Sequence, residues 1–190
     1  MNYGLFEALN GFAGRVDGID DLMEFSAVWL IYALFAVVAV LVAIAVWRRR
    51  LRPVIAVGAS GVIAFATATL IGRFDTEVRP FQSHTVHQLI AHEPGSSLPS
   101  DHATAAFTLA LAVGAFLYRR WGLILGVVAL VIGVSRIWVG VHYPADIVAA
   151  ALIAVLSVAV VNVASRGPRP RHRPDAASRT PIRAATDVTP

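Results

Sequence analysis

Long apolar runs alternate with short clusters of charged residues along most of the chain. A helix needs about 20 mainly apolar residues to cross the hydrocarbon core of a bilayer. Apolar stretches of about this length, or a little shorter, lie at roughly 26–47, 53–72, 103–118, 122–139 and 146–164. The third stretch is the shortest, and its neighbours favour its assignment as a span. The pattern therefore predicts an all-α, polytopic transmembrane bundle of about five spanning helices.

The two ends of the chain depart from this pattern. Residues 1–25 mix apolar side chains such as Leu5 and Phe6 with acidic ones, which favours a short amphipathic helix on the membrane surface, followed by a polar turn. Residues 166–190 are rich in Arg and Pro and poor in apolar residues, a composition typical of a disordered tail. The sequence thus predicts one membrane-embedded domain, 1–165, followed by this tail.

Composition supports a membrane protein. The chain is 57% hydrophobic and 15% charged, whereas soluble domains are usually close to half apolar and a quarter charged. The net charge of +4 would suggest nucleic-acid binding in a soluble protein. Here the basic residues lie between apolar runs and in the tail, so membrane lipids are the expected partners and nucleic acid is not. The absence of cysteine excludes disulfides and thiolate metal ligands.

Arginine clusters follow the first, third and fifth predicted spans, at 48–52, 119–120 and from Arg166 onward. With five spans these clusters share one face, which the positive-inside rule makes cytoplasmic. The tail is then cytoplasmic, and the N-terminus and the connections after the second and fourth spans lie outside.

The outer connections also contain arginines, contrary to this trend, and anion binding explains them. Arg73, Arg79 and Arg136 could together neutralise a phosphate or diphosphate, because a guanidinium pairs two oxygens at once. Ser100 stands immediately before an apolar helix, at a favourable N-cap position. The amide groups at the start of such a helix point towards a bound anion.

Two histidines in these connections suggest catalysis. His142 and Asp146 are four residues apart and share a helix face if Pro144 begins the fifth helix. A carboxylate on one imidazole nitrogen fixes the tautomer and leaves the other nitrogen free to attack. His102 would then act as a general acid. Two histidines in different roles fit a two-step transfer through phosphohistidine.

These residues stand in three blocks that resemble the signatures of the type-2 phosphatidic acid phosphatase superfamily. Those signatures are a basic residue spaced before Arg-Pro, then Pro-Ser-Gly-His, then Ser-Arg-x5-His-x3-Asp. The third matches in full over 135–146. The first has Arg73 in place of Lys, one position closer to Arg79, and the second has Asp101 in place of Gly. Both departures resemble the bacterial undecaprenyl-diphosphate phosphatases, and the resemblance covers about 1–164.

The resemblance implies a role for each matching residue and neither a metal nor another cofactor. His142 is the nucleophile, Asp146 orients it, and His102 is the general acid that later activates water. The residues implied in phosphate binding are Arg73, Arg79, Ser100, Asp101 through its amide, and Arg136.

The implied reaction is the dephosphorylation of undecaprenyl or decaprenyl diphosphate to the monophosphate, which recycles the lipid carrier of cell-wall synthesis and reduces bacitracin sensitivity. The implied location is a bacterial cell membrane, with the active site facing outward. Two alternatives stay open: a phosphatidic acid or phosphatidylglycerol-phosphate phosphatase, and a non-enzymatic lipid-binding or transport protein. Neither polyprenyl chain length nor oligomeric state follows from the sequence.

Further polar residues of the outer loop have no assigned role. His84, His87 and His92 raise a metal hypothesis, because imidazole suits zinc and copper, but they lack a convincing fourth ligand. His92 and Glu93 either touch the diphosphate or belong to a solvated loop.

Overall fold

The computed structural model describes residues 2–166 of the 190-residue chain. Helices make up most of this part, and its only β-type pairing is an isolated bridge between Val78 and Ser96. The tail predicted from 166 onward lies, apart from Arg166, outside the described residues. In chain order the elements are α1 (Asn2–Asn10), α2 (Asp17–Val28), α3 (Leu30–Trp47), α4 (Leu51–Phe74), α5 (Pro80–Ser83), α6 (Asp101–Ala112), the π-helical turn η1 (Val113–Leu117), α7 (Arg119–Trp138) and α8 (Pro144–Ser165).

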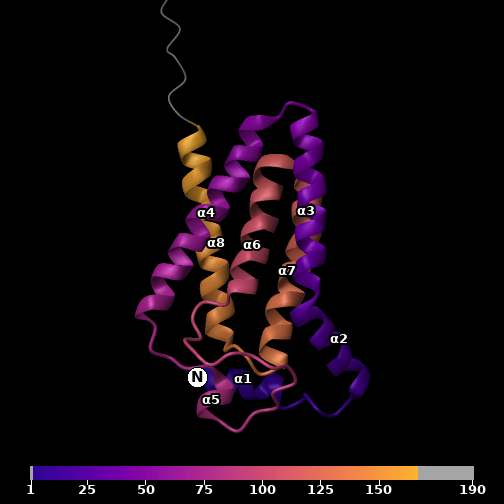
Figure 1. Cartoon of the computed structure of the whole chain (residues 1–190), viewed down its shortest axis with the longest axis vertical. Helices are drawn as coiled ribbons and strands as arrows, with labels where there is room; N and C mark the ends of the chain where they lie inside the picture. Colours follow the sequence, from indigo (N-terminus) through magenta and orange to yellow (C-terminus); the bar gives the residue numbers. More distant parts are fainter. Residues whose placement is uncertain (1, 167–190) are drawn as a thin grey trace, which may run out of the picture.

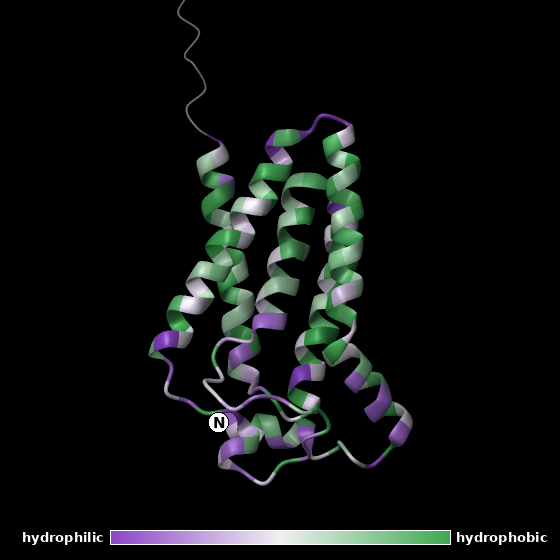
Figure 2. Ribbon diagram, viewed as in Figure 1, coloured by the Kyte–Doolittle hydropathy of each residue, from purple (hydrophilic) through white to green (hydrophobic). Residues whose placement is uncertain are grey.

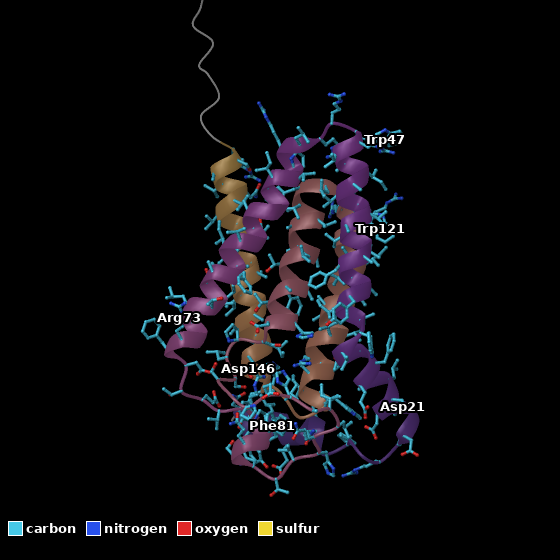
Figure 3. All side chains as sticks on the ribbon, in the orientation of Figure 1. Asp21, Trp47, Arg73, Phe81, Trp121 and Asp146 are labelled. Carbon is cyan, nitrogen blue, oxygen red and sulfur yellow. The ribbon has the colours of Figure 1, made fainter. Side chains whose placement is uncertain are left out.

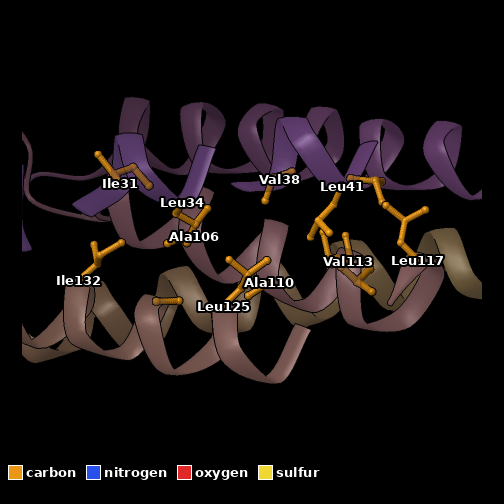
Figure 4. Close-up of a cluster of buried hydrophobic side chains, with 14 of the residues drawn as sticks. Ile31, Leu34, Val38, Leu41, Ala106, Ala110, Val113, Leu117, Leu125 and Ile132 are labelled. Carbon is orange, nitrogen blue, oxygen red and sulfur yellow. The ribbon is translucent and has the colours of Figure 1, made fainter. Parts of the chain in front are cut away.

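Helix α6 lies in the middle of the bundle, packed against α4, α7 and α8, while α3 contacts α4, α6 and α7 (Figure 1). The main core forms where Leu34 of α3 and Leu125 and Ile132 of α7 meet α6 (Figure 4). The α6 contribution includes Ala106 and Ala110, both almost fully buried. Such small side chains let helices approach closely, as is common in membrane bundles.

The outer faces of the bundle are apolar. In α4, for example, Val62 is 71% exposed and Phe65 is 69% exposed, and apolar residues cover much of the long helices (Figure 2). Within the described chain, α3, α4, α7 and α8 are long and apolar enough to cross a membrane, and the apolar segment Asp101–Leu117 is shorter. The predicted bundle, with its third span the shortest, is confirmed.

The N-terminal region differs in detail from its prediction. The predicted polar turn is confined to residues 11–16, because residues 17–28 form the second helix, α2. The acidic side chains of its first turn favour a helix start, and Asp20 also accepts hydrogen bonds from the Gly14 amide at 3.0 Å and the Trp138 indole at 2.8 Å. Helix α1 lies across one end of the bundle (Figure 1). Its residue Phe6 is buried beside Tyr143.

Arginines gather at the opposite end of the bundle. The Arg50 guanidinium donates to the Leu117 carbonyl at 3.4 Å and lies 5.5 Å from the centre of the Tyr118 ring. The turn after α3 therefore sits beside the turn before α7, which begins at Arg119. Trp47 marks this end in Figure 3, far from Asp146. The first two predicted arginine clusters thus share one end of the bundle.

The tightest helix contact predicts a specific sensitivity. A Cβ atom added at Gly122 of α7 would lie 2.6 Å from the Gly114 amide nitrogen and 3.0 Å from the Ala110 carbonyl oxygen. We expect Gly122→Ala to destabilise the bundle by about 1–3 kcal/mol, because these backbone atoms must move apart. The midpoint of thermal unfolding in detergent measures this loss. Gly126→Ala on the same helix is the control, since its Cβ would meet nothing within 4 Å; equal midpoints for both variants would contradict the account.

Candidate active site

Polar side chains from four separate segments meet at the end of the bundle that α1 and α5 cover (Figure 3). Arg136 comes from the last turn of α7, and His142 from the loop that follows it. Asp146 lies in the first turn of α8, where Pro144 begins the helix as predicted. His102 lies in the first turn of α6. The fourth segment is the long connection between α4 and α6, which contributes Arg79.

The imidazole of His142 is buried and has a defined tautomer. Its Nδ1 atom lies 3.0 Å from the Ser97 carbonyl oxygen and 3.2 Å from Oδ2 of Asp146. Its Nε2 atom lies 3.1 Å from Nη1 of Arg79. A carbonyl and a carboxylate accept hydrogen bonds, whereas a guanidinium only donates them. Nδ1 therefore carries the proton and Nε2 presents its lone pair.

The charge state of His142 follows from its surroundings. Burial lowers the pKa of His142 below its usual value, the hydrogen bond that its ring donates to Asp146 opposes this, and the positive charges of Arg136 and Arg79 lower it further. The imidazole is consequently neutral at pH 7. A neutral ring with a free lone pair at Nε2 is the form that attacks an electrophile.

Asp146 is held as firmly as the histidine it orients. Its Oδ2 atom accepts hydrogen bonds from the Ser97 hydroxyl at 2.5 Å, the Tyr143 amide at 2.8 Å and the His142 ring. Asp146 is fully buried. These donors fix the orientation of the carboxylate, which therefore lies where it can stabilise positive charge that develops on the imidazole.

Two arginines supply cationic donors beside this histidine. Arg136 is 2% exposed and donates from Nη1 to the Ala27 carbonyl at 3.2 Å. Its Nε and Nη2 atoms, and Nε of Arg79, find no hydrogen-bond partner within residues 2–166. Burial lowers the pKa of Arg79, although Asp101 and Asp146 oppose this effect. Buried guanidinium groups with unused N–H donors favour an anion between them.

The start of α6 faces the same region. Ser100 occupies the predicted N-cap position, but its side chain forms no capping hydrogen bond. Its buried hydroxyl has no partner in the described part of the chain. The hydroxyl and the first amides of α6, including that of Asp101, are therefore available to an anion.

Arg73 is the predicted phosphate ligand that the structure does not bring into this group. It lies in the last turn of α4 and is exposed. Figure 3 shows it at the edge of the bundle, away from Asp146.

A pocket and a cavity adjoin His102. The pocket, of about 380 Å³, is lined by the polar side chains of His92, Glu93, His102 and Arg136 together with apolar residues. The cavity, of about 410 Å³, lies between α3, α4 and α6 and is lined mainly by apolar side chains. Tyr32 and His102 line both spaces. A polar pocket that contains Arg136 and an apolar cavity therefore lie next to each other at His102.

The three histidines of the connection between α4 and α6 make different contacts. The ring of His84 lies against Tyr3, with centroids 3.9 Å apart and the ring planes tilted by 31°, whereas His87 uses its backbone to bind the side chain of Asn10. The His92 ring lies 6.1 Å from the His142 ring. Within residues 2–166 no three His, Cys, Asp or Glu side chains form a metal-binding group.

Comparison with known proteins identifies the family. The model described as the PAP2 superfamily matches residues 26–169, which include every residue of the site described above. The chain belongs to the PAP2 superfamily.

Relatives within it include two bacterial enzymes. The chain is 35% identical over 160 residues to the undecaprenyl-diphosphatase BcrC of Bacillus subtilis, covering 82% of this chain and 80% of that protein. It is 37% identical over 166 residues to a decaprenylphosphoryl-5-phosphoribose phosphatase of Mycobacterium tuberculosis, covering 86% of each. The crystal structure of Aquifex aeolicus LpxE superposes with a TM-score of 0.70 at 23% identity, over 84% of this chain and 93% of that one. This last likeness concerns the fold alone.

Sequence reasoning missed two residues that build this PAP2 site. Ser97 contacts His142 through its carbonyl and Asp146 through its hydroxyl. Asp75 holds that loop in place, because its Oδ2 atom accepts the Ser97 amide at 3.1 Å and the Leu98 amide at 2.8 Å. The position of Ser97, just before the Pro-Ser-Asp-His block, is the one feature of the sequence that could have indicated its place in the site. The contact of its carbonyl with His142 could not be predicted from the type of its side chain.

The tautomer of His142 can be tested directly. At pH 6.5 an unperturbed histidine is about half protonated, whereas the lowered pKa of His142 keeps its ring neutral. We expect ¹⁵N NMR of histidine-labelled protein in micelles to show a protonated Nδ1 and an unprotonated Nε2 at pH 6.5. His142→Gln assigns the signals. A doubly protonated ring, or a proton on Nε2, would contradict the assignment.

Proposed function

We propose that the chain hydrolyses a polyprenyl diphosphate, undecaprenyl or decaprenyl, to the monophosphate. The observation that carries the proposal is the unprotonated Nε2 of His142, which accepts a hydrogen bond from Arg79, close to the buried guanidinium of Arg136. His102, at the same end of the bundle, lines an apolar cavity. A nucleophile, anion donors and a hydrocarbon-binding surface are the three requirements of a lipid phosphatase. The relative BcrC is named for this substrate.

The first chemical step is an in-line attack. Nε2 of His142 forms a bond to the terminal phosphorus while the bond from phosphorus to the bridging oxygen breaks, and its electron pair stays on the lipid phosphate. Arg79 exchanges its contact with Nε2 for phosphate oxygens, and Arg136, Ser100 and the Asp101 amide bind the rest. Such fixed donors commonly supply the largest catalytic effect.

The second step releases phosphate. Water attacks the phosphorus of the phosphohistidine, its proton passes to His102, and the P–N bond breaks to return the neutral ring of His142. Asp146 and Ser97 hold the ring in one orientation through both steps. Arg73 is left out of this mechanism because it is exposed beyond the site.

The apolar cavity suits the first isoprene units of the substrate. Small residues of α4, Gly61 and Ala64, leave room for a chain beside Phe35 and Phe65. His102 lines both this cavity and the cationic pocket, so a chain here leads its phosphate towards the nucleophile. The substrate reaches the site from the bilayer and keeps most of its chain in lipid.

The charge distribution favours an active site on the outer side of the membrane. The arginine-rich turns after α3 and before α7 lie at the end opposite to the site, and the positive-inside rule makes that end cytoplasmic. A spent lipid carrier of cell-wall synthesis emerges on the outer leaflet, so this orientation suits its recycling.

A second candidate is a phosphatase for a lipid-linked sugar phosphate. The Mycobacterium tuberculosis relative, named for such a substrate, shares 37% identity over 86% of the chain. The chemistry at His142 is the same, and the leaving group is then a sugar hydroxyl in place of a phosphate.

A substrate panel separates these candidates. We expect purified protein in detergent to release phosphate from polyprenyl diphosphate with a higher kcat/KM than from phosphatidic acid or a polyprenyl-linked sugar phosphate. His142→Ala should abolish turnover on all of them, because it removes the nucleophile. Arg73→Ala, the exposed arginine at the same end, should stay within about 3-fold of wild type. Preference for the sugar phosphate would favour the second candidate, and full activity of His142→Ala would refute the mechanism.

A further inference from the structure

His92 is a third histidine at this site, and the mechanism above leaves it without a role. It belongs to the loop before α6 and is partly buried. Its ring stands nearly perpendicular to that of His142, at 86° and 6.1 Å between centroids. It lines the 380 Å³ pocket together with His102 and Arg136. A side chain at this place can contact a ligand that extends from the nucleophile.

The hydrogen bonding of His92 leaves one ring nitrogen for such a ligand. Its Nδ1 atom lies 3.3 Å from the carbonyl oxygen of the neighbouring residue Glu93. Since a carbonyl accepts, Nδ1 carries the proton in the neutral ring. Nε2 has no hydrogen-bond partner recorded among residues 2–166, so the fold does not occupy it.

A diphosphate substrate presents a second anionic group, the phosphate attached to the lipid. When the terminal phosphorus is attacked, the leaving group is a lipid monophosphate, whose second pKa is about 6. Such a group departs without a proton but accumulates negative charge. A phosphomonoester instead releases an alkoxide, a much stronger base that needs a proton from His102. Hydrogen-bond donors around the lipid-attached phosphate therefore stabilise the leaving group of a diphosphate and have no such effect on a phosphomonoester.

We propose that His92 binds the lipid-attached phosphate of a diphosphate substrate and so favours lipid diphosphates over lipid phosphomonoesters. His92, His102 and Arg136 surround the space into which that phosphate would extend from the terminal one. This inference rests on the proposed function and deepens it, since it names the residue that recognises the second phosphate.

His92 can donate to a phosphate from Nε2 only when its ring is protonated, and the ligand-free pocket keeps the ring neutral. Burial lowers the pKa of His92 to about 4, and the positive charges of Arg79 and Arg136 contribute. A bound diphosphate reverses the effect of these arginines by bringing negative charge between them and the ring. His92 then takes up a proton and donates from Nε2. The hydrogen bond to the Glu93 carbonyl favours the same protonation, because it raises the pKa of His92.

Inhibition by non-hydrolysable analogues tests whether His92 binds the second phosphate. It does not require the protein to hydrolyse both diphosphates and phosphomonoesters. The probes are an alkyl methylenediphosphonate and an alkyl phosphonate of equal chain length, competing with polyprenyl diphosphate for the full-length protein in detergent. We expect His92→Ala to raise the inhibition constant of the diphosphonate roughly 10- to 100-fold, the effect of losing a hydrogen bond to a charged group. The constant of the phosphonate should change less than about 3-fold.

Two further variants test whether the effect depends on a positive donor at position 92 and on this position alone. His92→Lys should restore most of the diphosphonate affinity, because it returns a positive donor to the pocket. His84→Ala, on the same loop but packed against Tyr3, should change neither constant. Equal changes for both probes in His92→Ala, or no change, would overturn the assignment while wild-type diphosphatase activity stands. A wild-type protein that hydrolyses lipid phosphomonoesters and no lipid diphosphate would instead overturn the proposed function.

Discussion

The shared proton on Nδ1 of His142 organises this end of the molecule. It lies between two acceptors, the Ser97 carbonyl and the Asp146 carboxylate, which together point Nε2 towards Arg79. This arrangement forms only if three segments pack together away from solvent. They are the loop before α6, which supplies Ser97, the start of α8, which supplies Asp146, and the connection before α5, which supplies Arg79. Asp75 holds the first of these by accepting two of its amides. The fold thereby keeps the His142 ring neutral and in one orientation among positive charges, which a solvated histidine would not provide.

The burial of these polar groups also favours the binding of an anion. Arg136 and Arg79 keep N–H groups without partners in the described chain, and Ser100 keeps its hydroxyl. Unpaired donors in a poorly solvated site cost free energy, so a phosphate that binds them relieves this cost. The apolar cavity beside His102 adds a surface for hydrocarbon. One ligand with a charged head and an apolar chain fits both spaces.

The sequence predicted the parts of this design that depend on local spacing. The spans followed from runs of apolar residues, and the approach of His142 to Asp146 followed from their separation on a helix that Pro144 begins. Ser97 was missed because its decisive contact is made by its backbone and depends on a loop shaped by Asp75. The motif groups Arg73 with the phosphate ligands, whereas the structure leaves it exposed on the last turn of α4, just before the chain bends. Spacing along the chain does not determine on which side of such a bend a residue falls.

The central claim is that Nε2 of His142 takes the phosphate before water does. Rapid mixing of the protein with polyprenyl diphosphate labelled in its terminal phosphate, an alkaline quench that preserves phosphohistidine, and mass spectrometry of the peptides would locate the label. The account predicts phosphate on Nε2 of His142. Phosphate on Nδ1 of that ring, or on any other residue, would contradict it.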